Sequence, residues 1–163
     1  MSSTIFHLEM LDRNELQSKP EPPGFELVYI DTPSPDLNRN LYQQVGGPWG
    51  WSGRLKWSDD DWIQHVQKNT VHTWVGQIDG QPIGYVEMEQ QADNNVEILY
   101  FGLLSAFIGK GLGGPFLATC IKQAWGLPGT KRVWLHTCTE DHPNARANYE
   151  KRGFVLFKTE IEE

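Results

Sequence analysis

Cysteine is scarce in this chain, and no apolar run is long. Only two cysteines, Cys120 and Cys138, occur among 163 residues, so a disulfide framework is excluded and both are expected to be reduced thiols. No apolar stretch approaches the ~20 residues that a membrane helix needs. The first residues also lack the charged segment and the long apolar segment of a signal peptide. These absences predict a cytoplasmic protein with no membrane partner.

Positive charge is also in short supply. Lys and Arg number 14 against 21 Asp and Glu, which gives a formal net charge of -7. Binding to nucleic acid requires a basic face that neutralises phosphates, so nucleic acid is not an expected partner. An acidic chain favours the approach of a cationic amine. The net charge affects how a ligand is attracted to the protein, but it does not identify the ligand.

The remaining composition suits one compact domain over residues 1–163. Hydrophobic residues make up 39% of the chain and aromatic residues 12%, which is enough for a core, and no linker divides the sequence. We expect N-terminal strands in residues 1–30, a helical region in residues 31–70, and alternating strands and helices in residues 71–163.

Hydrophobic periodicity and turn signals predict the order of the elements. Asp79-Gly80 between two apolar strands is typical of a hairpin, and Ser58 followed by three aspartates is typical of a helix start. The expected strands are 5–9, 25–30, 71–78, 83–90, 96–104, 131–137 and 154–158; the expected helices are 36–45, 58–68, 115–125 and one after residue 144. This order predicts an α/β fold of the α+β kind, with a mixed, mostly antiparallel central sheet and helices on both faces.

A glycine-rich loop joins an apolar strand to a helix. It reads Gly109-Lys110-Gly111-Leu112-Gly113-Gly114. A loop of this kind presents free backbone N–H groups and the positive end of the helix dipole, and glycine lets the backbone approach a ligand closely. Because such a helix start binds phosphate readily, we expect a phosphorylated cofactor here.

The spacing of Gly109, Gly111 and Gly114 also satisfies the G-x-G-x-x-G fingerprint of dinucleotide-binding proteins. That fingerprint should follow the first strand of its unit and precede an acidic residue about 20 positions on. Here several strands come earlier, and Glu140 and Asp141 come late. The P-loop motif G-x-x-x-x-G-K-[ST] is absent. A dinucleotide-dependent oxidoreductase therefore remains the less favoured alternative.

Two motifs in the second half of the chain carry a family resemblance. Gly109-Lys110-Gly111-Leu112-Gly113 is similar to a pyrophosphate-binding motif, R/Q-x-x-G-x-G/A, and Ala145 with Tyr149-Glu150-Lys151-Arg152-Gly153-Phe154 is similar to a late signature, A-x-x-x-Y-E-K-x-G-F. Both belong to the GNAT superfamily of N-acetyltransferases, which this chain resembles over residues 74–157, about half its length.

Two positions depart from the family pattern. Ile108 stands where the family's loop opens with Arg or Gln, so we expect weaker cofactor binding, with Lys110 as the source of charge. The family's asparagine seven residues before the tyrosine is His142 here, and Asn144 follows two positions later. Whether either of these two side chains contacts the pantetheine arm is left open.

The resemblance implies acetyl-CoA as the acetyl donor, bound between the strand that ends at Leu104 and the strand that ends near Thr137. It makes residues 71–163 the cofactor-binding core and residues 31–70 the substrate side. The chain leaves little room for the family's last hairpin strand, so we hypothesise that residues 5–9 fill the vacant sheet edge beside 154–158. The candidate cofactor-binding residues are Leu103, Leu104, Gly109, Lys110, Gly111, Leu112, Gly113, Gly114 and Asn144.

Acetyl transfer requires a base for the amine, polarisation of the thioester oxygen and an acid for the departing thiolate. Glu97 matches the strand glutamate that is the base in some family members, acting through a water; a structural carboxylate is an equally weighted alternative. Tyr149 matches the family's general-acid tyrosine, and its alternative is a core tyrosine that anchors the last helix. Backbone N–H groups of Leu103 and Leu104 would polarise the oxygen if Gly102 permits a bulge; otherwise this glycine marks close packing.

Tryptophans crowd the region in which the family commonly builds its substrate wall. Trp49 and Trp51 are the candidate substrate residues there, because aromatic walls suit an apolar or cationic ligand, although a single tryptophan more often completes a core. His136 is the third candidate if its side chain faces the site. His136, Cys138 and His142 lack a second paired motif, so no metal is expected.

The sequence therefore predicts an N-acetyltransferase that moves the acetyl group of acetyl-CoA to a primary amine by direct attack in a ternary complex. The expected acceptor is a small-molecule or peptide amine. A homodimer is compatible with such a domain, but the sequence carries no signal for it. A non-catalytic acyl-CoA-binding module on the same fold is the first alternative: Ile108 favours it, whereas Glu97 and Tyr149 favour the enzyme.

Overall fold

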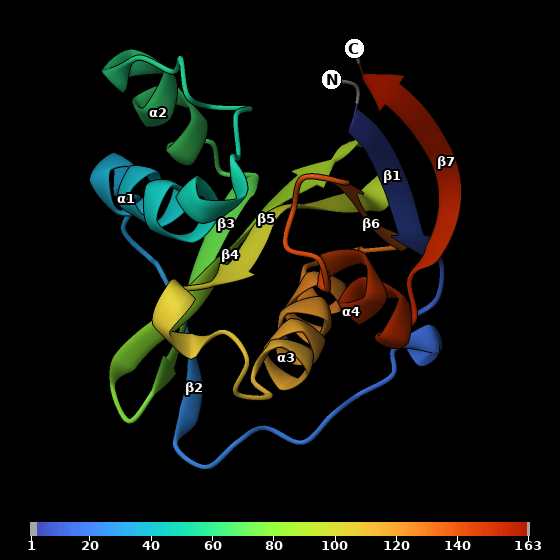
Figure 1. Cartoon of the computed structure of the whole chain (residues 1–163). Coiled ribbons are helices and arrows are strands. Elements are labelled where there is room, and N and C mark those ends of the chain that lie inside the picture. Colours follow the sequence, from blue (N-terminus) through green and yellow to red (C-terminus); the bar gives the residue numbers. More distant parts are fainter. Residues whose placement is uncertain (1–2, 163) are drawn as a thin grey trace.

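The computed structural model describes residues 3–162 and shows a seven-stranded sheet with helices on both faces (Figure 1). The strands are β1 (Ser3–Met10), β2 (Phe25–Tyr29), β3 (Val71–Ile78), β4 (Gln81–Gln91), β5 (Asn95–Leu103), β6 (Arg132–Cys138) and β7 (Val155–Glu162). The helices are α1 (Pro35–Gly46), α2 (Asp59–Val66), α3 (Gly113–Gly126) and α4 (Ala145–Lys151), with short 3-10 turns that include η1 (Arg13–Glu15) and η4 (Ser105–Phe107). The predicted order of strands and helices is confirmed.

The strand order is β2-β3-β4-β5-β6-β1-β7, and within residues 3–162 only β5 and β6 pair in parallel. The parallel pairing joins residues 95–97 of β5 to residues 132–134 of β6 and goes no further. Beyond Glu97 the two strands diverge towards their carboxyl ends. In open sheets with parallel strands, ligands bind at the carboxyl ends of the strands. The gap that opens between β5 and β6 is therefore the expected location of a ligand site.

The first strand lies between the last two. Ile5 of β1 faces Cys138 of β6 on one side and Glu160 of β7 on the other, both antiparallel. The hypothesis that residues 5–9 pair beside 154–158 is confirmed, but the expectation of an edge position is wrong, because β7 is the edge strand. Leu8 and Met10 are fully buried, which explains why β1 occupies an interior position.

Local sequence explains the start of α2 and the hairpin turn between β3 and β4. Ser58 caps α2 in both directions: its hydroxyl accepts from the Asp61 N–H at 3.2 Å, and its own N–H donates to the Asp61 carboxylate at 2.9 Å. Asp79 and Gly80 both have positive φ, 51° and 81°, as a tight hairpin between β3 and β4 requires. Both predictions made from these residues are confirmed.

Two apolar clusters form the core. The larger cluster packs α3 against the sheet and includes Phe116, Leu117 and Ile121, all fully buried. The smaller cluster, which includes Leu41, Val45, Val75 and Tyr85, packs α1 onto β3 and β4. Figure 1 shows α3 and α4 together on one side of the sheet and α1 and α2 on the other. None of the helices within residues 3–162 has the length and apolar character required to cross a bilayer.

Candidate active site

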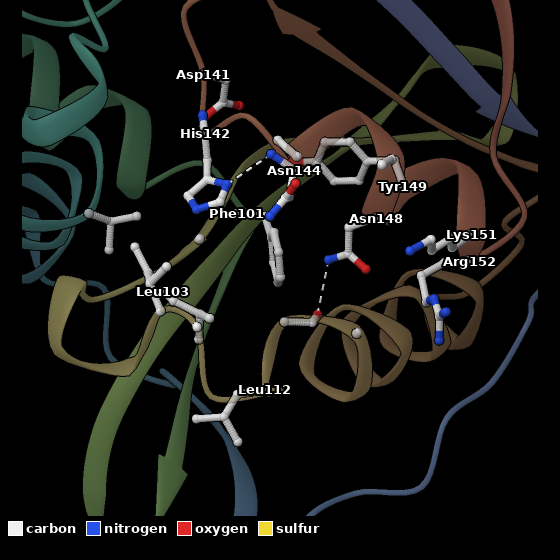
Figure 2. Close-up of a pocket in the computed structure, with 18 of the residues that line it drawn as sticks. Phe101, Leu103, Leu112, Asp141, His142, Asn144, Asn148, Tyr149, Lys151 and Arg152 are labelled. Atoms are coloured by element: carbon white, nitrogen blue, oxygen red, sulfur yellow. Dashed lines mark hydrogen bonds between the residues drawn. The ribbon is translucent and has the colours of Figure 1, made fainter.

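A cavity of about 440 Å³ lies where β5 and β6 diverge. Its walls come from the end of β5, the glycine-rich loop and first turn of α3, the segment before α4, α4 itself, and the tryptophan-bearing segment after α1. Figure 2 shows Phe101 and Leu103 of β5 facing the side chains of α4 across this space. The volume falls in the range of sites for small molecules and cofactors.

The glycine-rich loop presents an open helix start to the cavity. Gly109 and Gly111 have positive φ, 80° and 76°, which favours glycine at both positions. No side chain caps α3, and its first backbone bond runs from the Phe116 N–H to the Leu112 carbonyl. The N–H groups of Gly113 and Gly114 therefore precede the first helical hydrogen bond and remain available to an anion.

Two cations approach this helix start, and neither was predicted. A Cβ placed on Gly114 would lie 3.6 Å from the Lys19 ammonium nitrogen and 3.7 Å from Nη1 of Arg152. Arg152 is only 9% exposed, and its Nε has no hydrogen-bond partner among the described residues. An unpartnered buried guanidinium is costly, so this group favours a bound anion. Lys110, predicted to supply charge, does not line the cavity and lies over the Phe107 ring.

Helix α4 brings Tyr149 to the cavity wall. The Asn148 amide donates to the Gly113 carbonyl at 3.1 Å and so joins α4 to the start of α3. Tyr149 is 6% exposed, and its ring meets Phe101 and Phe154 edge-on. Burial raises the pKa of Tyr149, and the Asp141 charge raises it further. Like any tyrosine phenol, the Tyr149 side chain is protonated at neutral pH, and the burial makes it a weaker acid than a solvent-exposed tyrosine.

Glu97 and His136 lie together but outside the cavity. Glu97 is 6% exposed; its carboxylate accepts from the Gln91 amide at 2.9 Å and lies 3.4 Å from Nδ1 of His136. The Glu97 carboxylate raises the pKa of His136. Because Val96 and Ile98 face the α3 side, alternation places Glu97 on the opposite face of the sheet. The structure does not bring the two predicted catalytic residues into contact.

Of the two alternatives for Gly102, a bulge and close packing, the structure shows close packing, and the bulge of β5 lies elsewhere. The register of β4 and β5 shifts between the Glu87–Tyr100 and Met88–Ile98 pairs, which leaves Leu99 as the extra residue. Gly102 instead marks close packing, because a Cβ there would lie 2.4 Å from Cγ1 of Val45. The Leu104 N–H, expected to polarise the thioester oxygen, donates to the Ile83 carbonyl at 2.8 Å and is not free. Leu103 lines the cavity, whereas Leu104 does not.

Trp49 and Trp51, the two candidate substrate residues of this segment, both line the cavity. The Trp51 indole N–H donates to Oδ1 of Asp141 at 3.3 Å, and the Trp49 ring meets the His142 ring edge-on at 4.7 Å between centroids. His142 and Asn144, the two candidates for the pantetheine contact, line the same region, and the Asn144 N–H donates to Nδ1 of His142 at 3.0 Å (Figure 2). Asp141 is a site residue that sequence reasoning missed.

A buried ionic cluster fixes the tryptophan-bearing segment to the sheet. Glu87 of β4 is fully buried and accepts hydrogen bonds from Arg54, His65 and Asn38. Burial by itself would raise the pKa of Glu87, but the hydrogen bonds from His65 and Arg54 lower it to about 2. The Arg54 backbone N–H also donates to the Tyr42 hydroxyl on α1 at 3.0 Å. The segment that carries Trp51 is therefore held at both the sheet and α1.

The chain matches the model of the Acetyltransferase (GNAT) family over residues 36–154. Since this match covers well over half of the sequence and coincides with the fold and cavity just described, the chain belongs to the GNAT family of acetyltransferases. Acyl-CoA-dependent acetyl transfer is the general activity that this family and fold support. A comparison with curated proteins gave no match.

Solved structures share the fold at low sequence identity. A GCN5-related N-acetyltransferase from Kribbella flavida matches with a TM-score of 0.69 and 18% identity, over 97% of this chain and 56% of that chain. One from Sphaerobacter thermophilus matches with a TM-score of 0.75 and 12% identity, over 98% and 50%. An aminoglycoside acetyltransferase from an uncultured soil metagenomic sample, in complex with trehalose, has a TM-score of 0.61 and 12% identity, over 79% and 87%. The chain thus spans about half the length of the first two proteins.

Proposed function

We propose that this chain is an N-acetyltransferase that moves the acetyl group of acetyl-CoA to a primary amine by direct attack in a ternary complex. The observation that carries the proposal is one cavity whose walls include both an uncapped helix start and Tyr149. Arg152 lies beside the helix start and is buried without a hydrogen-bond partner for its Nε among the described residues, and Tyr149 lines the same cavity.

The residues of the chain fit the diphosphate of coenzyme A. The free N–H groups of Gly113 and Gly114 would donate hydrogen bonds to the phosphate oxygens, while Arg152 and Lys19 would supply the positive charge that Ile108 does not. Bound acetyl-CoA supplies an acetyl group activated as a thioester. Leu103 and Phe101 give the cavity an apolar wall that excludes water beside the reacting carbon.

Two proton transfers accompany the reaction. Tyr149 gives its phenolic proton to the sulfur as the C–S bond breaks and the N–C bond to the amine forms. We assign the proton lost by the amine nitrogen to Glu97, reached through water, because Glu97 lies where the pairing of β5 and β6 ends. The His136 side chain is half exposed beside Glu97 and connects this carboxylate to solvent.

Isothermal titration calorimetry with acetyl-CoA and with NAD tests the cofactor. We expect the wild-type protein to bind acetyl-CoA and not NAD. Arg152→Gln should weaken acetyl-CoA binding about tenfold, because one charge-assisted contact is lost. Arg146→Gln, close to Arg152 in the sequence, is the matched control, since Arg146 does not line the cavity and pairs with Glu150. The affinity of this variant for acetyl-CoA should stay within about twofold of the wild-type value.

Release of free CoA in the presence of a panel of amines then tests catalysis. Turnover with any primary amine supports the enzyme, whereas tight acetyl-CoA binding with no CoA release across the panel would leave the non-catalytic acyl-CoA-binding module as the function. Binding of NAD in place of acetyl-CoA would overturn both in favour of the oxidoreductase.

A further inference from the structure

Asp141 is the one acidic side chain of the described chain that lines the cavity. It is partly buried, and its hydrogen bonds come from neutral donors: the Thr137 hydroxyl to Oδ2 at 2.8 Å, and its neighbour's N–H and the Trp51 indole to Oδ1. Within residues 3–162 it forms no ion pair. The Asp141 carboxylate is therefore held at the cavity wall by hydrogen bonds, and no cationic side chain within residues 3–162 pairs with it.

The charges of the cavity are divided between its two sides. Figure 2 shows Asp141 and Arg152 far apart, on opposite sides of the labelled residues. Lys19, Lys151 and Arg152 make one side basic and suit phosphate, whereas the Asp141 side would repel phosphate and attract a cation. The two sides therefore cannot serve the same ligand group.

Aromatic rings stand beside this carboxylate. Trp51 contacts Asp141 directly, and Trp49 and His142 meet edge-on next to it. The Trp51 indole meets this carboxylate through its N–H edge, so a protonated amine bound here would gain an ion pair with Asp141 among aromatic side chains. Tyr149 lines the same cavity, so a cation held at Asp141 lies in the space that the reaction requires.

We infer that Asp141 binds the acceptor amine in its ammonium form, with Trp49 and Trp51 beside it, so that the preferred acceptors are alkyl primary amines. The bound ammonium first loses one proton to solvent water, which frees the nitrogen lone pair for attack; the second proton, lost as the N–C bond forms, is the one assigned to Glu97. Aromatic amines, which are uncharged at neutral pH, gain nothing from this carboxylate. This inference rests on the proposed function, because it names the acceptor class of the same site.

A charge-selective comparison of two acceptors tests the inference. The probes are phenethylamine, an alkyl amine that is protonated at neutral pH, and 4-methoxyaniline, an aryl amine that is largely uncharged. Asp141→Asn should lower kcat/KM for phenethylamine at least about tenfold, mainly through KM, and change kcat/KM for 4-methoxyaniline less than about threefold. Asp141→Glu, which keeps the charge, should retain the wild-type preference.

The control for this comparison is Glu140→Gln. Glu140 is the preceding residue and an exposed carboxylate that does not line the cavity, so neither acceptor should be affected. Equal losses for both probes in Asp141→Asn would mean that Asp141 only holds its loop, and equal activity in wild type and Asp141→Asn would mean that it does not meet the acceptor. Either result would overturn the inference.

A binding measurement separates this inference from the proposed function. If the wild-type protein binds acetyl-CoA but acetylates neither probe, saturation-transfer NMR of phenethylamine with the CoA complex decides the matter. Binding that is lost in Asp141→Asn would support the ammonium site while overturning catalysis. No binding to the wild-type complex would overturn the ammonium site.

Discussion

Replacing Glu87 by glutamine removes the charge at the centre of the buried ionic cluster while it keeps the shape of the side chain. The Arg54 guanidinium, 6% exposed, then loses its counter-charge. The pKa of Glu87 is about 2 in the folded protein against an ordinary value of 4.5, and one pKa unit is worth roughly 1.4 kcal/mol. The carboxylate therefore contributes about 3 kcal/mol at neutral pH, which agrees with the ~3–5 kcal/mol typical of breaking a buried ion pair. We expect Glu87→Gln to lose about that much free energy of unfolding.

Urea denaturation at a series of pH values measures this loss. Because the folded pKa of Glu87 lies below its unfolded value, its contribution is fully present above pH 4.5 and is lost as the pH falls towards 2. The difference between wild type and Glu87→Gln should therefore be largest at neutral pH and shrink through this acidic range. Glu89→Gln, two residues along β4 and outside the cluster, should cost less than about 0.5 kcal/mol. A pH-independent difference, or a Glu87→Gln variant as stable as Glu89→Gln, would refute the reasoning.

Two further predictions concern the cavity. Tyr149→Phe should lower kcat for CoA release about 100-fold while the acetyl-CoA dissociation constant stays within about twofold, because only the proton donor is removed; equal turnover in steady-state assays would remove Tyr149 from the mechanism. Gly102→Ala places a Cβ 2.4 Å from Val45 and should lower the free energy of unfolding by ~1–3 kcal/mol in urea denaturation. Gly126→Ala, whose Cβ meets nothing within 4 Å, is the control, and an equal effect of the two substitutions would contradict the packing argument.

The sequence predicted those features that depend on short stretches of chain. The glycine-rich loop before α3, the helix start at Ser58 and the Asp79-Gly80 hairpin all follow from residue type and nearest neighbours. Apolar periodicity located α3 and its strand for the same reason. The resemblance to a known family added the orientation of Tyr149 towards the cavity, which no local pattern contains.

Features that depend on contacts between distant segments were missed. Lys19 is carried to the start of α3 by the long connection between η1 and β2, which passes that end of the helix in Figure 1. Arg152 occupies the variable position of the late signature, and Asp141 was noted only as an acidic residue after a strand. The Leu99 bulge depends on how β4 pairs with β5, so the single sequence of β5 pointed instead to its glycine.

The position of β1 has a consequence for synthesis. This strand is made well before its two partners, β6 and β7, and the sheet pairing that helps to bury Leu8 and Met10 waits for them. A nascent chain that has extended only to α3 on the ribosome therefore carries an unpaired apolar strand near its amino end. Strands in this state are prone to aggregate, so production of the protein should depend on how quickly β6 and β7 follow from the exit tunnel.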